Sequence, residues 1–185
     1  MDAARPPAGG DEGAAAPRHA MDRMWAGWRS TYAAAVGNGA LTGQGSIFRG
    51  ILDSGLSDAE THIVWRGETV FAILNAFPYT SGHLLLMPYR EVPDLEHLDD
   101  AESAELWAAV RAAVVAVKAA YHPQGVNVGL NLGEAAGAGI PSHLHVHVLP
   151  RWTADSNFMT SIAETRVLPE PLDESWTKLR DAWPA

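Results

Sequence analysis

Cysteine is absent from this chain of 185 residues. Its absence excludes disulfide bonds and any metal site built on thiolate ligands. Long apolar runs are missing too, since no stretch approaches the ~20 residues that a helix needs to cross a bilayer. The first residues also lack the apolar core of a secretory signal. We therefore expect a cytoplasmic protein with no membrane partner.

Basic residues are scarce, with 13 Lys and Arg against 22 Asp and Glu and a formal net charge of −9. Nucleic-acid binding requires clustered cations that face the phosphates. The charge balance therefore argues against a DNA or RNA partner. A small anionic substrate remains compatible with it, because backbone amides and histidines can hold an anion locally.

The composition of the chain changes after the first 20 residues. Residues 1–20 are rich in Ala, Gly and Pro and offer almost nothing to pack, so we predict a disordered tail. Residues 21–185 have the length of one domain with a real core. Trp25 and Trp28 mark where burial is expected to begin.

The remaining pattern predicts an α+β fold with an antiparallel sheet that helices cover on one face. Gly67 and Glu68 predict a tight hairpin between two apolar runs. A short helix is expected at 45–52 and a closing helix at 174–183. The expected strands lie at 62–66, 69–74, 84–88, 126–132 and 144–150.

A long helix is predicted before the fourth strand. Asp99 and Glu102 offer a capping box at its start. Apolar residues then recur at helical spacing, at Leu106, Trp107, Val110, Val114, Val117 and Tyr121. We interpret Trp107 and Tyr121 as core residues, and the acidic cluster between residues 91 and 105 as a solvated face.

Three histidines alternate with aliphatic residues in the run from 143 to 148. On a strand they would share one face, with neighbours about 6.7 Å apart. His143 and His147 would then lie about 13 Å apart and could hardly converge on one zinc ion. A structural metal and a plain polar strand edge remain alternatives. The pattern favours a reaction surface, because neutral imidazole is a good nucleophile that also exchanges protons near neutral pH.

The sequence around these histidines resembles a known family. Residues 143–151, which read His-Leu-His-Val-His-Val-Leu-Pro-Arg after a glycine-rich loop, resemble the signature of the histidine-triad (HIT) family of nucleotide hydrolases and transferases. Residues 71–88 resemble the family's strand–turn–Gly-His–strand segment. Residues 151–158 resemble the branch with actinobacterial diadenosine tetraphosphate phosphorylases. The resemblance implies an antiparallel sheet with a long helix and shorter helices packed on it.

The resemblance implies nucleotidyl transfer from a dinucleoside polyphosphate, diadenosine tetraphosphate above all, to phosphate, giving ADP and ATP. His145 matches the middle histidine of the signature, and would attack the α-phosphorus to form a nucleotidyl-histidine intermediate. His147 would contact phosphate oxygens or the leaving group. His143 would orient its neighbours, its backbone carbonyl holding the other ring nitrogen of His145. His83 joins these three as a supporting residue.

Further residues match substrate contacts of the family. Asn75 matches a residue on the nucleotide ribose and Asn131 one that reaches the phosphates, although either could instead stabilise a turn. The backbone amides of Gly137 and Gly139 could cradle phosphate, or the two glycines could serve turn geometry alone. Trp152 is expected at a subunit contact or near the substrate.

Two departures from the family limit what can be carried over. Ser142 supplies the hydroxyl of the glycine-rich loop, but alternation aims it away from the face of His143, which leaves assistance to the leaving group open. Many relatives carry a Cys-x-x-Cys near residue 46 as part of a zinc site, and this chain has none. We therefore expect no metal and no required cofactor, apart from Mg²⁺ that could arrive with the substrate phosphates.

Two alternative functions remain open. The protein could be a HIT hydrolase of dinucleoside polyphosphates or nucleoside phosphoramidates, with water as acceptor. It could also be a nucleotide-binding module whose triad is catalytically silent. The resemblance further implies a homodimer or homotetramer.

Overall fold

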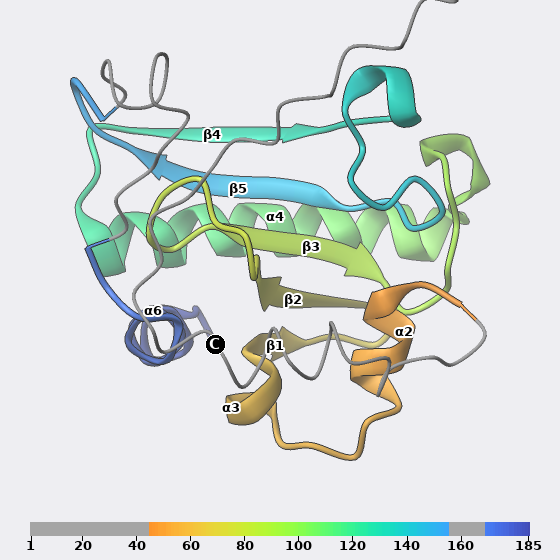
Figure 1. The fold of residues 1–185 in the computed structure, drawn as a ribbon, viewed down its shortest axis with the longest axis horizontal. Coiled ribbons are helices and arrows are strands. Elements are labelled where there is room, and N and C mark those ends of the chain that lie inside the picture. The colour runs from red at the N-terminus through yellow and green to blue at the C-terminus, as the bar shows by residue number, and fades with distance from the viewer. Residues whose placement is uncertain (1–44, 156–168) are drawn as a thin grey trace, which may run out of the picture.

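The structure is a computed structural model that describes residues 45–155 and 169–185. The predicted tail at 1–20, Trp25, Trp28 and residues 156–158 of the family match lie outside these ranges. Five antiparallel strands form one sheet in the order β1-β2-β3-β5-β4 (Figure 1). The strands are β1 (Ile63–Arg66), β2 (Val70–Leu74), β3 (Leu84–Pro88), β4 (Gly125–Leu130) and β5 (Val146–Arg151). The predicted α+β class is confirmed.

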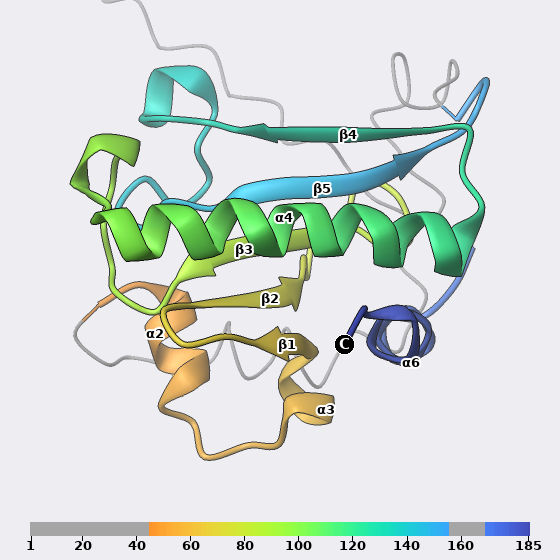
Figure 2. The ribbon, with the colours of Figure 1, turned by 180° about the vertical axis from the view of Figure 1, so that it is seen from behind.

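The long helix runs across one face of the sheet (Figure 2). It begins at the predicted capping box, where Asp99 accepts the Glu102 N–H at 2.8 Å and Glu102 accepts the Asp99 N–H at 3.0 Å. The helices are α2 (Ile47–Leu52), α3 (Asp58–Thr61), α4 (Asp100–Tyr121) and α6 (Leu172–Ala182), with 3-10 turns η2 (Leu95–His97) and η3 (Glu134–Ala136). Within the described ranges, none of these helices is long and apolar enough to cross a membrane.

Alternation along β5 divides its side chains between the two faces of the sheet. Leu144, Val146 and Val148 are buried in the main core under α4, as predicted. The strand itself begins at Val146, because the Leu144 N–H donates to the Val92 carbonyl at 2.7 Å instead of joining the ladder. Other members of this core are Leu84, Leu86, Leu106, Val110, Ala113 and Val117.

A second, smaller cluster covers the opposite face, on which the histidines lie. It joins Phe48 and Ile51 of α2 to apolar side chains of β1, β2 and β3, namely Ile63, Phe71, Ile73, Leu85 and Met87. The short helix predicted at 45–52 thus forms and closes one end of the histidine face (Figure 1).

One prediction for the α4 region is wrong, and another holds with one exception. Trp107 was expected in the core but is 42% exposed, because its neighbour Leu106 occupies the face that meets the sheet. The acidic cluster was expected to be solvated, and Glu96, Asp99 and Asp100 are exposed. Glu102 is the exception, since it is only 5% exposed. Arg90 approaches the Glu102 carboxylate to 2.6 Å, and Glu105 accepts the backbone N–H of Glu68 at 2.8 Å. These carboxylates therefore hold loops against the helix.

Candidate active site

Strand pairing brings the catalytic candidates together. His147 lies opposite Leu85 in the β3–β5 pair, and His83 immediately precedes β3. The ring centroids of His145 and His147 are 5.0 Å apart, and those of His83 and His147 are 5.1 Å apart. The sheet thus assembles, on the face opposite α4, the four histidines that the sequence predicted as one group.

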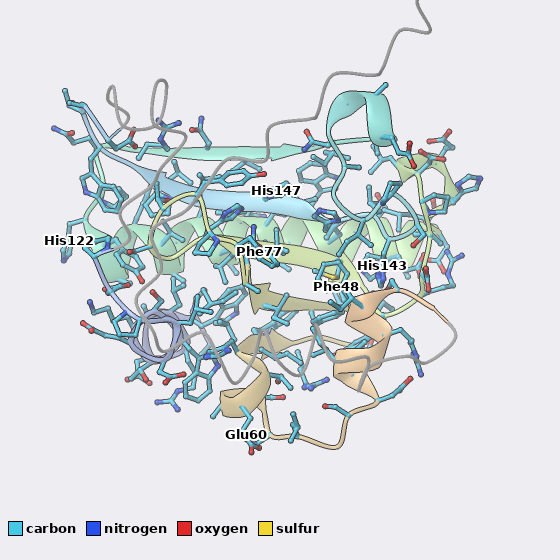
Figure 3. The ribbon with its side chains drawn as sticks, viewed as in Figure 1. Phe48, Glu60, Phe77, His122, His143 and His147 are labelled. Atoms are coloured by element: carbon cyan, nitrogen blue, oxygen red, sulfur yellow. The ribbon has the colours of Figure 1, made fainter. Side chains whose placement is uncertain are left out.

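His143 is fully buried and held at both ring nitrogens. Its Nε2 lies 2.8 Å from the Pro88 carbonyl oxygen, and its Nδ1 lies 2.6 Å from the Ser46 hydroxyl. A carbonyl can only accept, so Nε2 carries the proton and the Ser46 hydroxyl donates to Nδ1. Burial lowers the pKa of His143, which favours this neutral form. The Phe48 ring of α2 stands edge-on to the imidazole at 5.4 Å (Figure 3).

His145 is oriented by the backbone of the preceding histidine. Its Nδ1 lies 2.8 Å from the His143 carbonyl oxygen, as predicted. Nδ1 therefore carries the proton, and Nε2 keeps a lone pair. Burial lowers the pKa of His145, so the ring is neutral near neutral pH. A neutral imidazole with a free Nε2 is the form that can act as a nucleophile.

His83 fixes the tautomer of His147. The Tyr79 backbone N–H donates to His83 Nδ1 at 3.1 Å, so the proton of His83 is on Nε2. That Nε2–H then donates to His147 Nδ1 at 2.9 Å. Gly82 allows this placement, because it has a φ of 75° and an added Cβ would lie 2.4 Å from the Tyr121 ring.

His147 is left with a proton on Nε2 and no acceptor for it. Among the described residues, this nitrogen is buried without a hydrogen-bond partner. Burial lowers the pKa of His147 to about 4, with a smaller contribution from His145, so the ring stays neutral. An unsatisfied buried donor costs about 1–3 kcal/mol. Such a cost indicates a position where an acceptor atom of a ligand completes the site.

The two asparagines that were predicted to contact the substrate both hydrogen-bond to backbone groups of nearby loops. Asn75 accepts the Phe77 N–H at 2.9 Å, and its Nδ2 lies 3.3 Å from His83 Nδ1. Asn75 thus caps a turn, and its predicted contact with the nucleotide ribose stays a prediction. Asn131 follows the last residue of β4, which pairs with Val146 beside His145. Its Nδ2 makes a long contact of 3.4 Å to the Gly137 carbonyl.

The glycine-rich loop is built mainly by turn geometry. Gly137 has a φ of 92°, and its N–H donates to the Glu134 carbonyl at 2.9 Å. The Gly137 amide is thus engaged by the turn, and the predicted phosphate cradle stays a prediction. Gly139 is exposed, and a Cβ there would meet nothing within 4 Å. Ser142 is also exposed and hydrogen-bonds to Glu91, which lowers the pKa of that carboxyl.

The far end of β5 lies away from the histidines. Trp152 is half-buried with its ring edge-on to Tyr121 at 6.3 Å, five residues beyond His147. Arg151 binds Asp155 at 2.6 Å and Asn127 at 2.7 Å. Among the described residues, no hydrogen bond or ring contact joins Trp152 to the triad. Its predicted role in substrate binding or at a subunit contact stays a prediction.

Sequence reasoning missed the groups that hold the first histidine. Ser46 is 97 residues from His143 in the chain, and the Pro88 carbonyl is 55 residues away. A serine before an apolar helix is a recognisable N-cap, and Ser46 does accept the Arg49 N–H at 3.4 Å. That signal predicts the start of a helix but not the second partner of the hydroxyl.

Comparison with known proteins agrees with this geometry. The HIT domain family matches residues 57–154, just over half of the chain. The AP-4-A phosphorylase of Mycobacterium tuberculosis is 48% identical over 128 residues, which cover 69% of this chain and 66% of that protein. The match thus spans just under two thirds of the phosphorylase. The asymmetrical bis(5'-nucleosyl)-tetraphosphatase of Schizosaccharomyces pombe is 33% identical over 95 residues, which cover 51% of this chain and 52% of that protein.

A solved structure raises the question of a metal. The crystal structure of a Zn-bound histidine triad family protein from Mycobacterium smegmatis has a TM-score of 0.60 and 28% identity, and the alignment covers 74% of this chain and 91% of that one. The donors in this chain do not fit a zinc ion, since both ring nitrogens of His143 are engaged by protein groups. Residues 45–155 and 169–185 contain no group of three or more His, Cys, Asp or Glu side chains that could hold one metal ion.

The fold, the four histidines and the sequence comparisons agree. The antiparallel sheet with its long helix is shared with the M. smegmatis structure, and the matched segment 57–154 contains His83, His143, His145 and His147. The chain belongs to the histidine-triad (HIT) family.

Proposed function

We propose that this protein transfers a nucleotidyl group from a dinucleoside polyphosphate to inorganic phosphate. The observation that carries the proposal is the state of His145, whose Nδ1–H is bound to the His143 carbonyl and whose Nε2 lone pair is free for attack. The neighbouring His147 presents a buried N–H without an acceptor. A nucleophile beside an unsatisfied donor suits the attack on a phosphorus atom whose oxygens need a partner.

The reaction proceeds in two displacements. Nε2 of His145 attacks the α-phosphorus of diadenosine tetraphosphate, the bond to the bridging oxygen breaks, and ATP leaves. The nucleotidyl-histidine carries positive charge on its ring, and the His143 carbonyl accepts its Nδ1–H throughout. A phosphate oxygen then attacks the same phosphorus, the P–N bond breaks, and ADP leaves. His147 Nε2–H donates to oxygens of the transferred phosphoryl group in both steps.

Similarity favours phosphate over water as the acceptor. The relative with 48% identity is named AP-4-A phosphorylase, whereas the named tetraphosphatase is 33% identical over a shorter segment. The substrate and acceptor of this chain therefore follow the phosphorylase in our proposal. A cytoplasmic location belongs to the same proposal.

Product analysis tests this assignment. Diadenosine tetraphosphate is incubated with the protein in the presence and absence of phosphate, and the products are separated by chromatography. We expect ADP and ATP, with turnover that depends on phosphate. AMP and ATP formed at the same rate in both conditions would place this chain among the hydrolases.

A variant of the nucleophile tests the mechanism itself. His145→Ala should lower kcat by at least about 10³-fold while the protein stays folded, because it removes the attacking atom but little packing. Mass spectrometry of the wild-type protein after rapid quenching should detect a nucleotidyl adduct that this variant lacks. Near-normal activity of the variant would contradict the covalent route.

We also propose that folding requires no metal and that Mg²⁺ enters only with the substrate phosphates. Elemental analysis of the purified protein checks the first point. Stoichiometric zinc whose removal by a chelator unfolds the protein would contradict it.

Two copies of the chain are proposed to associate through the sheet edge at β4.

A further inference from the structure

We propose that Ser46 is a positioning residue for the nucleophile, because its hydroxyl orients His143 and thereby the carbonyl that holds His145. The inference rests on the proposed function of His145. It concerns a residue outside the histidine signature, at the N-cap of helix α2 instead of on the sheet.

The argument begins with the two bonds of the His143 ring. Nε2–H donates to Pro88 at 2.8 Å, which leaves Nδ1 as an acceptor that needs a donor inside a buried site. Ser46 supplies that donor at 2.6 Å. The ring is thus fixed at both ends, between α2 and the last residue of β3.

Fixing the ring fixes the nucleophile. The backbone carbonyl of His143 accepts the Nδ1–H of His145 at 2.8 Å. A His143 ring that lost the Ser46 bond would leave a buried nitrogen without a partner, and its easiest relief is a rotation that pulls on its own backbone. His145 would then lose its preferred tautomer, in which Nε2 is unprotonated.

The position of Ser46 is itself controlled. Its backbone N–H donates to the Glu91 carboxylate at 2.8 Å, and Glu91 also takes a hydrogen bond from Ser142. Glu91 follows β3 and Ser142 immediately precedes His143, so the network ties both flanks of the site to the start of α2. The bond from the hydroxyl to His143 is also much shorter than the capping contact of 3.4 Å to Arg49.

The capping role must be separated from the positioning role. Ser46→Ala removes both, whereas Ser57→Ala removes the N-cap of α3, which lies in a capping box with Glu60 outside the contacts of the site. We expect Ser46→Ala to lower kcat at least about tenfold with KM changed less than about threefold. Ser57→Ala should keep the wild-type kcat. Ser46→Thr, which keeps the hydroxyl, should recover most of the kcat lost in Ser46→Ala.

A spectroscopic measurement makes the test independent of turnover. Ring nitrogen NMR shifts of the wild-type protein should show His143 protonated on Nε2 and His145 on Nδ1. In Ser46→Ala the His145 signals should show a mixture of tautomers. This readout decides the matter even if the protein turns over no dinucleotide. If Ser46→Ala does not fold, Ser46→Gly takes its place, because glycine also lacks the hydroxyl but is a better N-cap than alanine.

Three results would overturn the proposal. The first is a kcat decrease of less than tenfold in Ser46→Ala, or a change confined to KM. The second is a wild-type His143 that is protonated on Nδ1. The third is a His145 tautomer that is the same in Ser46→Ala and the wild type.

Discussion

At the scale of single residues, the triad depends on where each imidazole keeps its proton. A neutral imidazole has one proton for two nitrogens, so a partner that can only accept, or only donate, decides the tautomer. The Pro88 and His143 carbonyls do this for His143 and His145, and the Tyr79 N–H does it for His83. Backbone atoms of β3 and of the segments that precede β3 and β5 therefore set the chemistry of the side chains.

Burial of these rings predicts the pH dependence of the reaction. The pKa of His145 is lowered below the usual imidazole value of about 6.5, so the reactive neutral form persists as the pH falls through that value. We expect kcat/KM for diadenosine tetraphosphate, which reports the first attack, to stay constant from about pH 8 to below 6.5 and to fall only at lower pH. A pH–rate profile measures this.

The control for this prediction is the unfolding transition. Circular dichroism at each pH shows whether the protein remains folded where kcat/KM falls. A decline centred above pH 6.5 in a folded protein would contradict the assignment of His145 as a buried neutral nucleophile.

The sequence predicted part of this site for a clear reason. Alternation is a local property, so it placed His143, His145 and His147 on one face without knowledge of the rest of the chain. Ser46 could not be predicted in the same way, because its bond to His143 exists only after α2 folds onto the sheet. The bond from the Gly137 amide to the Glu134 carbonyl was not predicted either, because it forms only once the η3 turn is made.

At the scale of elements, one face of the sheet packs the main core under α4 and the other face carries the histidines. Leu86 points into the core under α4, and Leu85, one residue before it, packs in the cluster on the histidine face. Leu85 also lies opposite His147 in the strand pair. The two leucines are the same side chain on the same strand, so they form a matched pair for mutation.

We expect Leu86→Ala to lower the free energy of unfolding by about 2–5 kcal/mol while kcat stays within about twofold of the wild type. Leu85→Ala should also destabilise the protein, and it should in addition lower kcat because His147 loses a packing neighbour. Urea titration and steady-state kinetics of both variants measure the two effects. Equal loss of kcat in the two variants would show that the faces are not independent.

Element boundaries were predictable where they depend on local chemistry. The capping box of Asp99 and Glu102 gave the start of α4 correctly. The closing helix was expected at 174–183 but begins at Leu172, after Pro171. The core role of Trp107 was wrong, since helical spacing alone does not say which of two adjacent apolar residues meets the sheet. That choice is made by the orientation of α4 on the strands.

At the scale of the whole molecule, β4 forms one edge of the sheet. In the part of the chain that the structure describes, β4 pairs only with β5, and its outer edge has no strand partner. Val128 on this strand is 44% exposed, although Val126 and Leu130 on the same face pack against the core. An unpaired edge with an exposed apolar side chain favours pairing with another strand.

We predict that this edge joins two copies of the chain, because identical subunits most often associate about a two-fold axis. Size-exclusion chromatography with light scattering should give at least twice the mass of one chain at micromolar concentration. Val128→Glu should shift the protein toward the monomer, since two carboxylates would face each other across the paired edges. Val115→Glu is the matched control, because Val115 is 54% exposed but lies on α4. A wild-type monomer, or an equal shift in both variants, would contradict association through β4.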